Sequence, residues 1–197
     1  MITESKQPHR LRTVAHRFAT RQDAHDLPGL FDQCVNLHST RTAHRMDSSG
    51  FSRSPRSAFY REFFLRQVAA GQAALSCLLL DGQVISFFAG VVNGPTFVAM
   101  LTAFDERYAT AAPGHVNIFH MVGALNASGF RACDLSKGWQ AYKARWSTES
   151  YDLHHVVVPL RNDALARCTL GPLLTLKDRG RALGVNEKTR SVIELFT

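Results

Sequence analysis

Two cations lie between large aromatic residues in the segment 130–146, FRACDLSKGWQAYKARW. The segment begins like a buried strand around Asp134, breaks at a Lys-Gly pair, and then carries Tyr142, Lys143 and Arg145. Arginine offers a planar fork of donors to pairs of oxygen atoms, and lysine offers a point charge. We therefore expect Lys143 and Arg145 to bind a phosphate or carboxylate group. The alternative is a short amphipathic helix whose aromatic residues fill the core while the cations reach solvent.

The elements that must position this segment follow from hydrophobic periodicity and turn signals. A strand pattern over 151–160 follows the segment, and the meander that precedes it contains the hairpin signals Asp81-Gly82 and Asn93-Gly94. The resulting order of elements does not alternate strictly, so we predict an α/β fold with a mixed, mainly antiparallel sheet and helices on both faces. Helices are expected over 26–45, 54–70, 114–128 and 164–183, and strands over 73–80, 83–92, 96–104, 130–135 and 151–160.

The chain has 197 residues and a formal net charge of +7, with 45% hydrophobic and 20% charged residues. These values are typical of one globular domain and favour anionic partners. We expect a basic tail or edge strand over 1–22, the main domain over 23–162 and a helical extension over 163–197. The four cysteines and nine histidines lack metal-binding spacing, so no metal is expected. No stretch is long and apolar enough to span a membrane, and widely spaced cysteines fit the reducing cytoplasm.

The order of motifs resembles the GNAT acyltransferase fold, and in particular the acetyltransferase family 6 domain. That family includes CelD-like proteins linked to cellulose and exopolysaccharide synthesis and is related to Fem-type aminoacyl transferases. The matching elements, which with the upstream helices cover roughly residues 25–160, are Phe104-Asp105, Tyr108-Ala109, Pro113-Gly114, Asp134 and Tyr142-Lys143-Ala144-Arg145-Trp146. Leu37-His38-Ser39-Thr40-Arg41 is also similar to a helix end of the family.

The resemblance implies transfer of an acyl group from acetyl-CoA or another acyl-CoA to an amine or hydroxyl. The loop 111–115 opens a helix, whose free N–H groups would bind the donor's pyrophosphate. Pro113 belongs to this loop but has no backbone N–H group, so the N–H groups of Gly114, His115 and Val116 are expected to bind the pyrophosphate. Lys143 and Arg145 are expected to add positive charge to the site of the donor or acceptor. The alternative is a plain Pro-Gly helix start.

Several groups near strand ends are available to move the proton of such a reaction. They are the carboxylates of Asp105 and Asp134, the phenols of Tyr108 and Tyr142, and His115. Tyr142 would protonate the leaving thiolate, although a packed tyrosine is the alternative. A carboxylate within an apolar strand is costly unless it is paired, so Asp134 is expected to pair with Lys137 or Arg131.

The sequence departs from the family pattern in three ways. Many members are about twice as long, the acidic pair before the Tyr-Lys motif is replaced by Trp139-Gln140, and the usual glycine-rich pyrophosphate loop is absent. These departures leave open a non-catalytic half domain that holds an acceptor or pairs with a second half or a second copy. The expected acceptor is a small molecule, glycan or peptide of the cell envelope. Nucleic acid is the least favoured partner because the sequence has no recognisable nucleic-acid motif.

Overall fold

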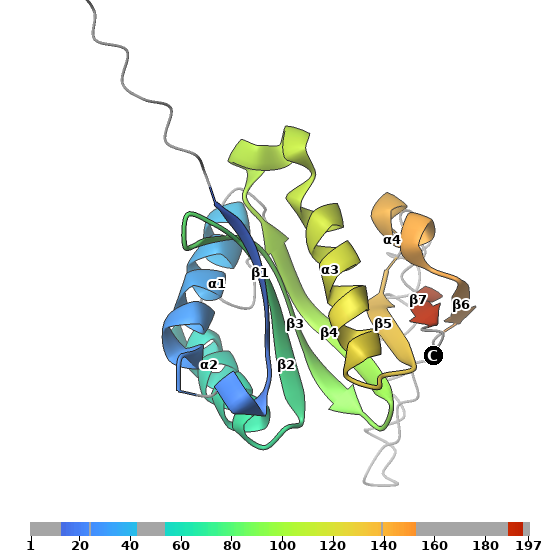
Figure 1. The fold of residues 1–197 in the computed structure, drawn as a ribbon, viewed down its shortest axis with the longest axis horizontal. Coiled ribbons are helices and arrows are strands. Elements are labelled where there is room, and N and C mark those ends of the chain that lie inside the picture. The colour runs from blue at the N-terminus through green and yellow to red at the C-terminus, as the bar shows by residue number, and fades with distance from the viewer. Residues whose placement is uncertain (1–12, 24, 43–53, 139, 153–188, 195–197) are drawn as a thin grey trace, which may run out of the picture.

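The computed structural model describes residues 13–23, 25–42, 54–138, 140–152 and 189–194 of the chain. These residues form a seven-stranded sheet in the order β1-β2-β3-β4-β5-β7-β6 (Figure 1). The neighbouring strands are antiparallel except β4 and β5, which run parallel. The elements are β1 (Val14–Ala19), η1 (Arg21–Asp23), α1 (Leu27–Thr42), α2 (Ser54–Ala69), β2 (Ala73–Leu80), β3 (Gln83–Asn93), β4 (Thr96–Phe104), η2 (Glu106–Ala111), α3 (Pro113–Ala127), β5 (Ala132–Lys137), α4 (Ala141–Trp146), β6 (Glu149–Asp152) and β7 (Thr189–Glu194).

The central meander has the hairpins that the sequence predicts. Asp81 and Gly82 both have positive φ, 51° and 80°, as a two-residue hairpin turn between right-twisted strands requires. Gly94, with φ of 56°, provides the next turn. The side chain of Asp81 also accepts a hydrogen bond from the N–H of Thr13 at 2.8 Å, which ties the start of β1 to this turn.

Helices cover both faces of the sheet, which confirms the predicted fold class. On one face α1 and α2 bury a cluster around Phe31, Phe64 and Phe87. On the other face α3 packs Ile118, Met121 and other residues against β3, β4 and β5 (Figure 1). The sheet is therefore the shared wall of two hydrophobic cores, as expected for a three-layer α/β domain.

A buried polar network fixes α3 on its face of the sheet. The Oδ1 atom of Asn117 accepts a hydrogen bond from the Ser76 hydroxyl at 2.7 Å, and its amide donates to the Ser86 hydroxyl at 3.3 Å. His16 lies 2.9 Å from the same Ser76 oxygen, and burial lowers the pKa of His16 to about 4. These groups satisfy one another in the interior, so the network sets the position of the helix along the strands.

The centre of the sheet is irregular at β4. The register between β3 and β4 shifts so that Gly90 pairs with Ala99 and Ala89 pairs with Leu101, which leaves Met100 as the extra residue of a bulge. On its other side β4 pairs with β5 only from Thr96 to Val98. The strands separate beyond these three pairs, and their separation leaves a gap in the sheet beside the carboxyl half of β4.

The termini of the fold refine the sequence predictions. The basic N-terminal segment contributes an edge strand, β1, and the predicted loop after β4 contains the 3₁₀ helix η2. The last predicted strand begins at Glu149, two residues early, and its residues after 152 lie outside the described part of the chain. The helical extension expected over 163–197 is wrong for Thr189–Glu194, where β-branched residues form strand β7 between β5 and β6. The helix expected over 164–183 lies outside the described residues.

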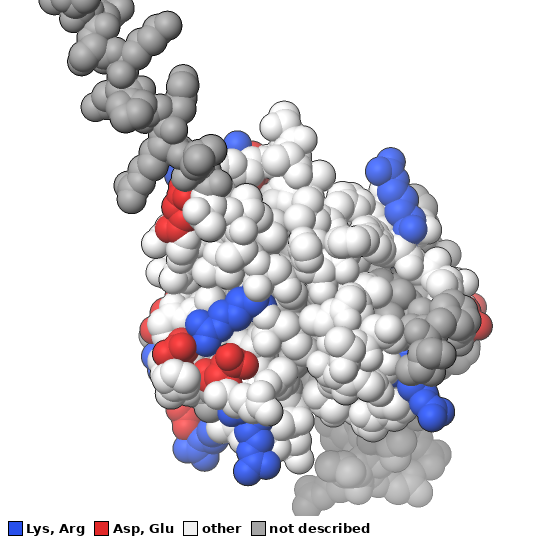
Figure 2. All heavy atoms as spheres, in the orientation of Figure 1, with Lys and Arg blue, Asp and Glu red and all other residues white. Residues whose placement is uncertain are grey.

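Charges are unevenly distributed over the surface. Figure 2 shows basic and acidic side chains intermixed on the side of α1 and α2, whereas the face formed by α3 has few. The α3 sequence, PGHVNIFHMVGALNA, contains no Asp, Glu, Lys or Arg. Among the helices of the described residues, none is long and apolar enough to cross a lipid bilayer.

The bulge provides a test of the fold at Gly90. A methyl group at this position would overlap the carbonyl oxygen of Val98 and the ring of Phe97. We expect Gly90→Ala to lower the free energy of unfolding by about 1–3 kcal/mol, because a well-packed core resists added volume. Gly123→Ala on the open face of α3 is the matched control and should raise it by about 0.5–1 kcal/mol. Urea unfolding followed by circular dichroism measures both, and equal effects would show that the crowding is absent.

Candidate active site

A cleft of about 670 Å³ opens where β4 and β5 separate. Its walls come from both layers of helices: the carboxyl end of α1 lies on one side of the sheet, and the amino end of α3 and the start of α4 lie on the other (Figure 1). The lining residues are His38, Arg41, Phe88, Thr102, Phe104, Ala109, Ala112, Pro113, Gly114, His115, Ile118, Gln140 and Tyr142. The cleft therefore connects the two faces of the sheet.

The amino end of α3 forms one wall of this cleft. Ala112 precedes the helix in the left-handed conformation, with φ of 48°, and Pro113 occupies the first turn. The carbonyl of Ala112 accepts hydrogen bonds from the N–H groups of His115, at 2.9 Å, and Val116, at 3.2 Å. Of the three amides predicted to bind a pyrophosphate, that of Gly114 remains without a hydrogen-bond acceptor among the described residues. The positive end of the helix dipole adds to its attraction for anions.

His115 links α3 to α4. Its Nδ1 atom accepts a hydrogen bond from the indole N–H of Trp146 at 2.8 Å, and the two rings are stacked. In neutral His115 the proton must therefore be on Nε2, so the imidazole can donate a hydrogen bond from that atom. Accepting a proton at Nδ1 would break the bond to Trp146, which makes His115 a poor general base in this arrangement.

Tyr142 is the residue of the predicted catalytic set that lines the cleft. Its ring packs at the edge of the core beneath α3, and burial raises the pKa of Tyr142 to about 12. The phenol consequently keeps its proton at neutral pH and can donate a hydrogen bond into the cleft.

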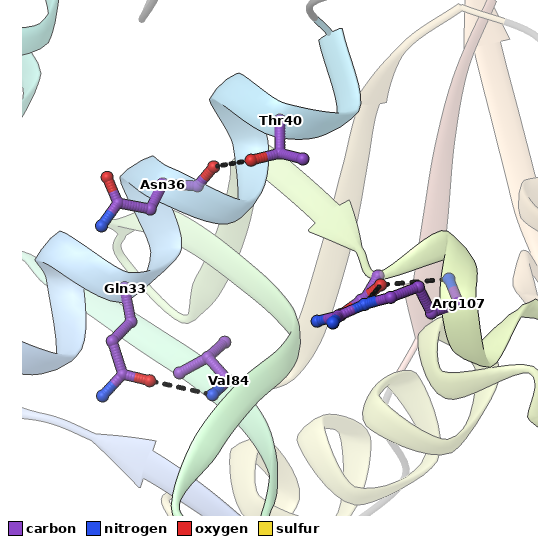
Figure 3. A network of polar contacts seen from close by, with 6 residues as sticks. Gln33, Asn36, Thr40, Val84 and Arg107 are labelled. Carbon is purple, nitrogen blue, oxygen red and sulfur yellow. Dashed lines mark hydrogen bonds and ion pairs between the residues drawn. The ribbon is translucent and has the colours of Figure 1, made fainter.

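Asp105 and Tyr108 are placed beside the cleft rather than in it. The Asp105 carboxylate caps η2 by accepting from the N–H of Arg107 at 3.0 Å, and it also pairs with the Arg107 guanidinium at 2.6 Å (Figure 3). These hydrogen bonds lower the pKa of Asp105, so the group is a weak base. Tyr108 packs against a small cluster around Leu78 and Ile85. Neither residue is among those that line the cleft, so we assign both to local structure.

Asp134 is buried in β5 and also lies away from the cleft walls. Its carboxylate accepts hydrogen bonds from the N–H of Ser136 at 2.7 Å and from the hydroxyl of Tyr151 at 3.2 Å. The partners expected from the sequence, Lys137 and Arg131, are exposed. The carboxylate therefore stabilises the end of β5, where Ser136 adopts φ of 66°, and connects it to β6.

The positions of Lys143 and Arg145 do not support the prediction that both bind a ligand. Lys143 is 4% exposed, and its ammonium donates hydrogen bonds to the carbonyl oxygens of Ser136, at 3.1 Å, and Lys137, at 2.8 Å. The ammonium thus satisfies two backbone carbonyl oxygens at the end of β5, where the chain leaves the strand. Because it is buried and donates to these carbonyls, its geometry does not support phosphate binding. Arg145 is exposed and is not among the residues that line the cleft.

Two residues at the end of α1, which the predicted site did not include, lie in the cleft. Burial lowers the pKa of His38, and nearby Arg41 lowers it further, so its imidazole is neutral at pH 7. The Arg41 guanidinium lies 4.0 Å above the Phe104 ring. The available signal was the segment 37–41, whose similarity to a helix end of the family gave no role to either side chain.

One hydrogen bond attaches α1 to the sheet, and another lies within its last turns. The Gln33 side chain accepts from the N–H of Val84 at 2.9 Å, across the hairpin that begins β3 (Figure 3). Near the end of the helix, the Thr40 hydroxyl donates to the carbonyl of Asn36 at 2.9 Å. The Gln33 bond therefore attaches α1 to β3, the Thr40 bond lies within the helix, and Arg41 of the last turn contacts Phe104 at the end of β4.

Metal chemistry has no evident ligand set here. The described residues contain no group of three or more His, Cys, Asp or Glu side chains close enough to hold a metal ion. Cys34, Cys77 and Cys133 are buried thiols, as small core residues are expected to be.

Comparisons with known proteins agree with the geometry. Residues 4–144 match the family model described as an acetyltransferase (GNAT) domain, and no curated protein matches the chain in sequence. PaiA N-acetyltransferase from Thermoplasma acidophilum, solved in complex with coenzyme A, has a TM-score of 0.51 and 10% identity over 92% of this chain and 99% of that one.

Two further solved structures have the same fold. An aminoglycoside acetyltransferase from an uncultured soil metagenomic sample, in complex with sisomicin, has a TM-score of 0.53 and 12% identity over 75% of this chain and 97% of that one. A GNAT-family acetyltransferase from Staphylococcus aureus Mu50 has a TM-score of 0.51 and 6% identity over 93% and 100% of the two chains. Identities this low establish the shared fold.

The structural assignment of Lys143 leads to a stability prediction. Lys143→Met removes the cation and leaves two strand-end carbonyls without their donor, so we expect the free energy of unfolding to fall by about 2–3 kcal/mol. Arg145→Met on the same short helix is the matched control, and an exposed change of this kind should stay within about 0.5 kcal/mol. Chemical denaturation of both variants measures the difference. If Lys143→Met were as stable as Arg145→Met, the assignment would be wrong.

Proposed function

The chain belongs to the GNAT acetyltransferase family, and we propose that it transfers an acyl group from acyl-CoA to an amine or hydroxyl. The observation that carries this proposal is the cleft through the sheet between β4 and β5, with the amino end of α3 and the Tyr142 phenol on one side. Such a cleft lets two substrates approach from opposite faces and meet at one point.

The donor is proposed to lie on the α3 side. The N–H of Gly114 and the helix dipole suit the pyrophosphate of coenzyme A, although the loop lacks the family's usual glycines. A solved structure of the same fold binds coenzyme A, which supports this donor. The small residues Ala109 and Ala112 also line this wall and leave room for an extended pantetheine chain.

The acyl group would move in two linked events. The acceptor nucleophile attacks the thioester carbonyl carbon, and the resulting tetrahedral intermediate expels the sulfur of coenzyme A as the new amide or ester forms. We propose that the neutral His38 imidazole takes the proton from the nucleophile and that Tyr142 donates a hydrogen bond to the leaving sulfur. Both residues line the cleft, one from each side of the sheet.

The acceptor is proposed to be a small molecule, glycan or peptide related to the cell envelope or to exopolysaccharide. This proposal rests on the family resemblance and is compatible with the aminoglycoside that a solved structure of the same fold binds. A cytoplasmic location would give access to acyl-CoA.

The donor site is tested by calorimetric titration with acetyl-CoA. We expect saturable binding by the wild-type protein and a loss of affinity of at least about tenfold in Gly114→Val, because a branched side chain at the cleft wall would block the approach of phosphate. Gly123→Val on the open side of the same helix is the control and should bind normally. An absence of acetyl-CoA binding by the wild type would favour a non-catalytic, acceptor-holding domain.

The role of the phenol is tested by Tyr142→Phe, which keeps the packing and removes the hydroxyl. We expect kcat to fall about 10- to 100-fold at unchanged affinity for acetyl-CoA, because the lost hydrogen bond forms to charge that develops in the transition state. Since the pKa of Tyr142 is about 12, the ratio of wild-type to variant rates should stay constant between pH 7 and pH 10. A ratio that falls towards one across that range would mean that Tyr142 ionises there and acts otherwise.

A further inference from the structure

Arg41 dominates the electrostatics of the cleft. It is the one formally charged side chain among the described residues that line the cleft, and no Asp or Glu is among them. Uncharged walls with limited access to water screen a cation weakly, so its field attracts an anion more strongly there than on an open surface.

The guanidinium is oriented for recognition of a planar group of oxygens. It lies 4.0 Å above the Phe104 ring, and the side chain is 24% exposed. The contact with Phe104 restricts the position of the guanidinium, and its planar fork of N–H donors matches a carboxylate, which can accept two parallel hydrogen bonds. Glu106 lies 3.7 Å away through Nε, a long contact to a side chain that is 69% exposed. The ion pair with Glu106 is therefore weak, and a ligand carboxylate can compete with Glu106 for the guanidinium.

Arg41 comes from a different layer of helices than the proposed phosphate site. α1 packs on the face of the sheet that carries the Phe31 and Phe64 cluster, whereas α3, with the proposed phosphate site at Gly114, packs on the opposite face. The two groups meet at Phe104: the Arg41 guanidinium lies 4.0 Å from the centre of this ring, and a Cβ on Gly114 would lie 3.7 Å from its edge. An anion beside Arg41 would thus lie near the donor's phosphates but be bound from the layer of α1.

We propose that Arg41 binds a carboxylate of the acceptor, so that the enzyme acylates a nucleophile carried by an anionic molecule. This inference rests on the proposed acyl transfer and names the chemical class of its second substrate. Glu106 occupies the guanidinium when the acceptor is absent and gives way when it binds.

The test uses acid and amide pairs of product analogues, starting with N-acetylglycine and N-acetylglycinamide and extending to the N-acetyl derivatives of the common amino acids. Binding is measured by calorimetry with and without coenzyme A. At least one acid should bind roughly 10- to 100-fold more tightly than its amide, as a charge-assisted bidentate contact allows. Arg41→Gln should reduce this ratio to about one, and Arg41→Lys should retain part of it.

Two further variants and a folding control distinguish a specific contact at Arg41 from a general effect of charge or of unfolding. Arg66→Gln, an exposed arginine on α2 that pairs with Glu62, should keep the full ratio, and Glu106→Gln should increase affinity for the acid by removing the competing carboxylate. Thermal unfolding confirms that each variant is folded. The proposal is overturned if no acid in the series binds more tightly than its amide.

The donor titration distinguishes this inference from the function on which it rests. If Arg41→Gln weakens coenzyme A binding while the acid-to-amide ratio is unchanged, the guanidinium contacts donor phosphate and the proposal is wrong. If coenzyme A fails to bind the wild type, the acyl transfer reaction is contradicted, yet the ratio of acid to amide still decides the role of Arg41.

Discussion

The short pairing between β4 and β5 is the constraint on which the site depends. The two parallel strands belong to one sheet but share only three residue pairs, so beyond Val98 the described residues provide β4 with no pairing partner on that side. The bulge at Met100 lies at the same point and increases the local twist, which turns the remainder of β4 away from β5. An interruption in the centre of a sheet would normally be filled by side chains. Here a cleft remains, and residues at the ends of helices line it.

That interruption explains why residues from opposite layers can act together. In an unbroken sheet, α1 and α3 would be separated by the full thickness of the backbone and its side chains. Here His38 from one layer and His115 from the other line one cleft. The anchors that hold the two helices are polar and specific: Gln33 to β3 for α1, and the Asn117 network for α3. Because each helix is attached to the same meander, their ends keep a fixed relation across the gap.

The parts of the fold that follow from local signals could be predicted from sequence. The Asp-Gly and Asn-Gly turns, the helix starting at Pro113 and the edge strand near the N-terminus depend on nearby residues, and the structure contains them. Strand β7 could not be foreseen, because its pairing with β5 joins residues about sixty positions apart and a six-residue segment with only two apolar residues, Val192 and Ile193, has no clear periodicity. The site residues were harder to predict than the strands. The sequence of the segment 130–146 shows that it contains cations but not whether their side chains point into the protein, into the cleft or into solvent. Only packing distinguishes Lys143, turned into the protein, from Arg41, turned into the cleft.

The cost of burying a charge explains why Lys143 has a structural role whereas Arg41 lies in the cleft. A buried ion needs partners, and Lys143 and Asp134 have them in the carbonyls, N–H group and hydroxyl around the end of β5. Asp105 likewise has Arg107. These held groups stabilise the irregular backbone near the cleft and are not among the residues that line it. The residues that line the cleft include His38 and Tyr142, which burial keeps neutral at pH 7, together with His115 and one guanidinium. This composition fits the proposed division of roles, in which His38 takes a proton, Tyr142 donates a hydrogen bond and the single guanidinium binds an anionic acceptor.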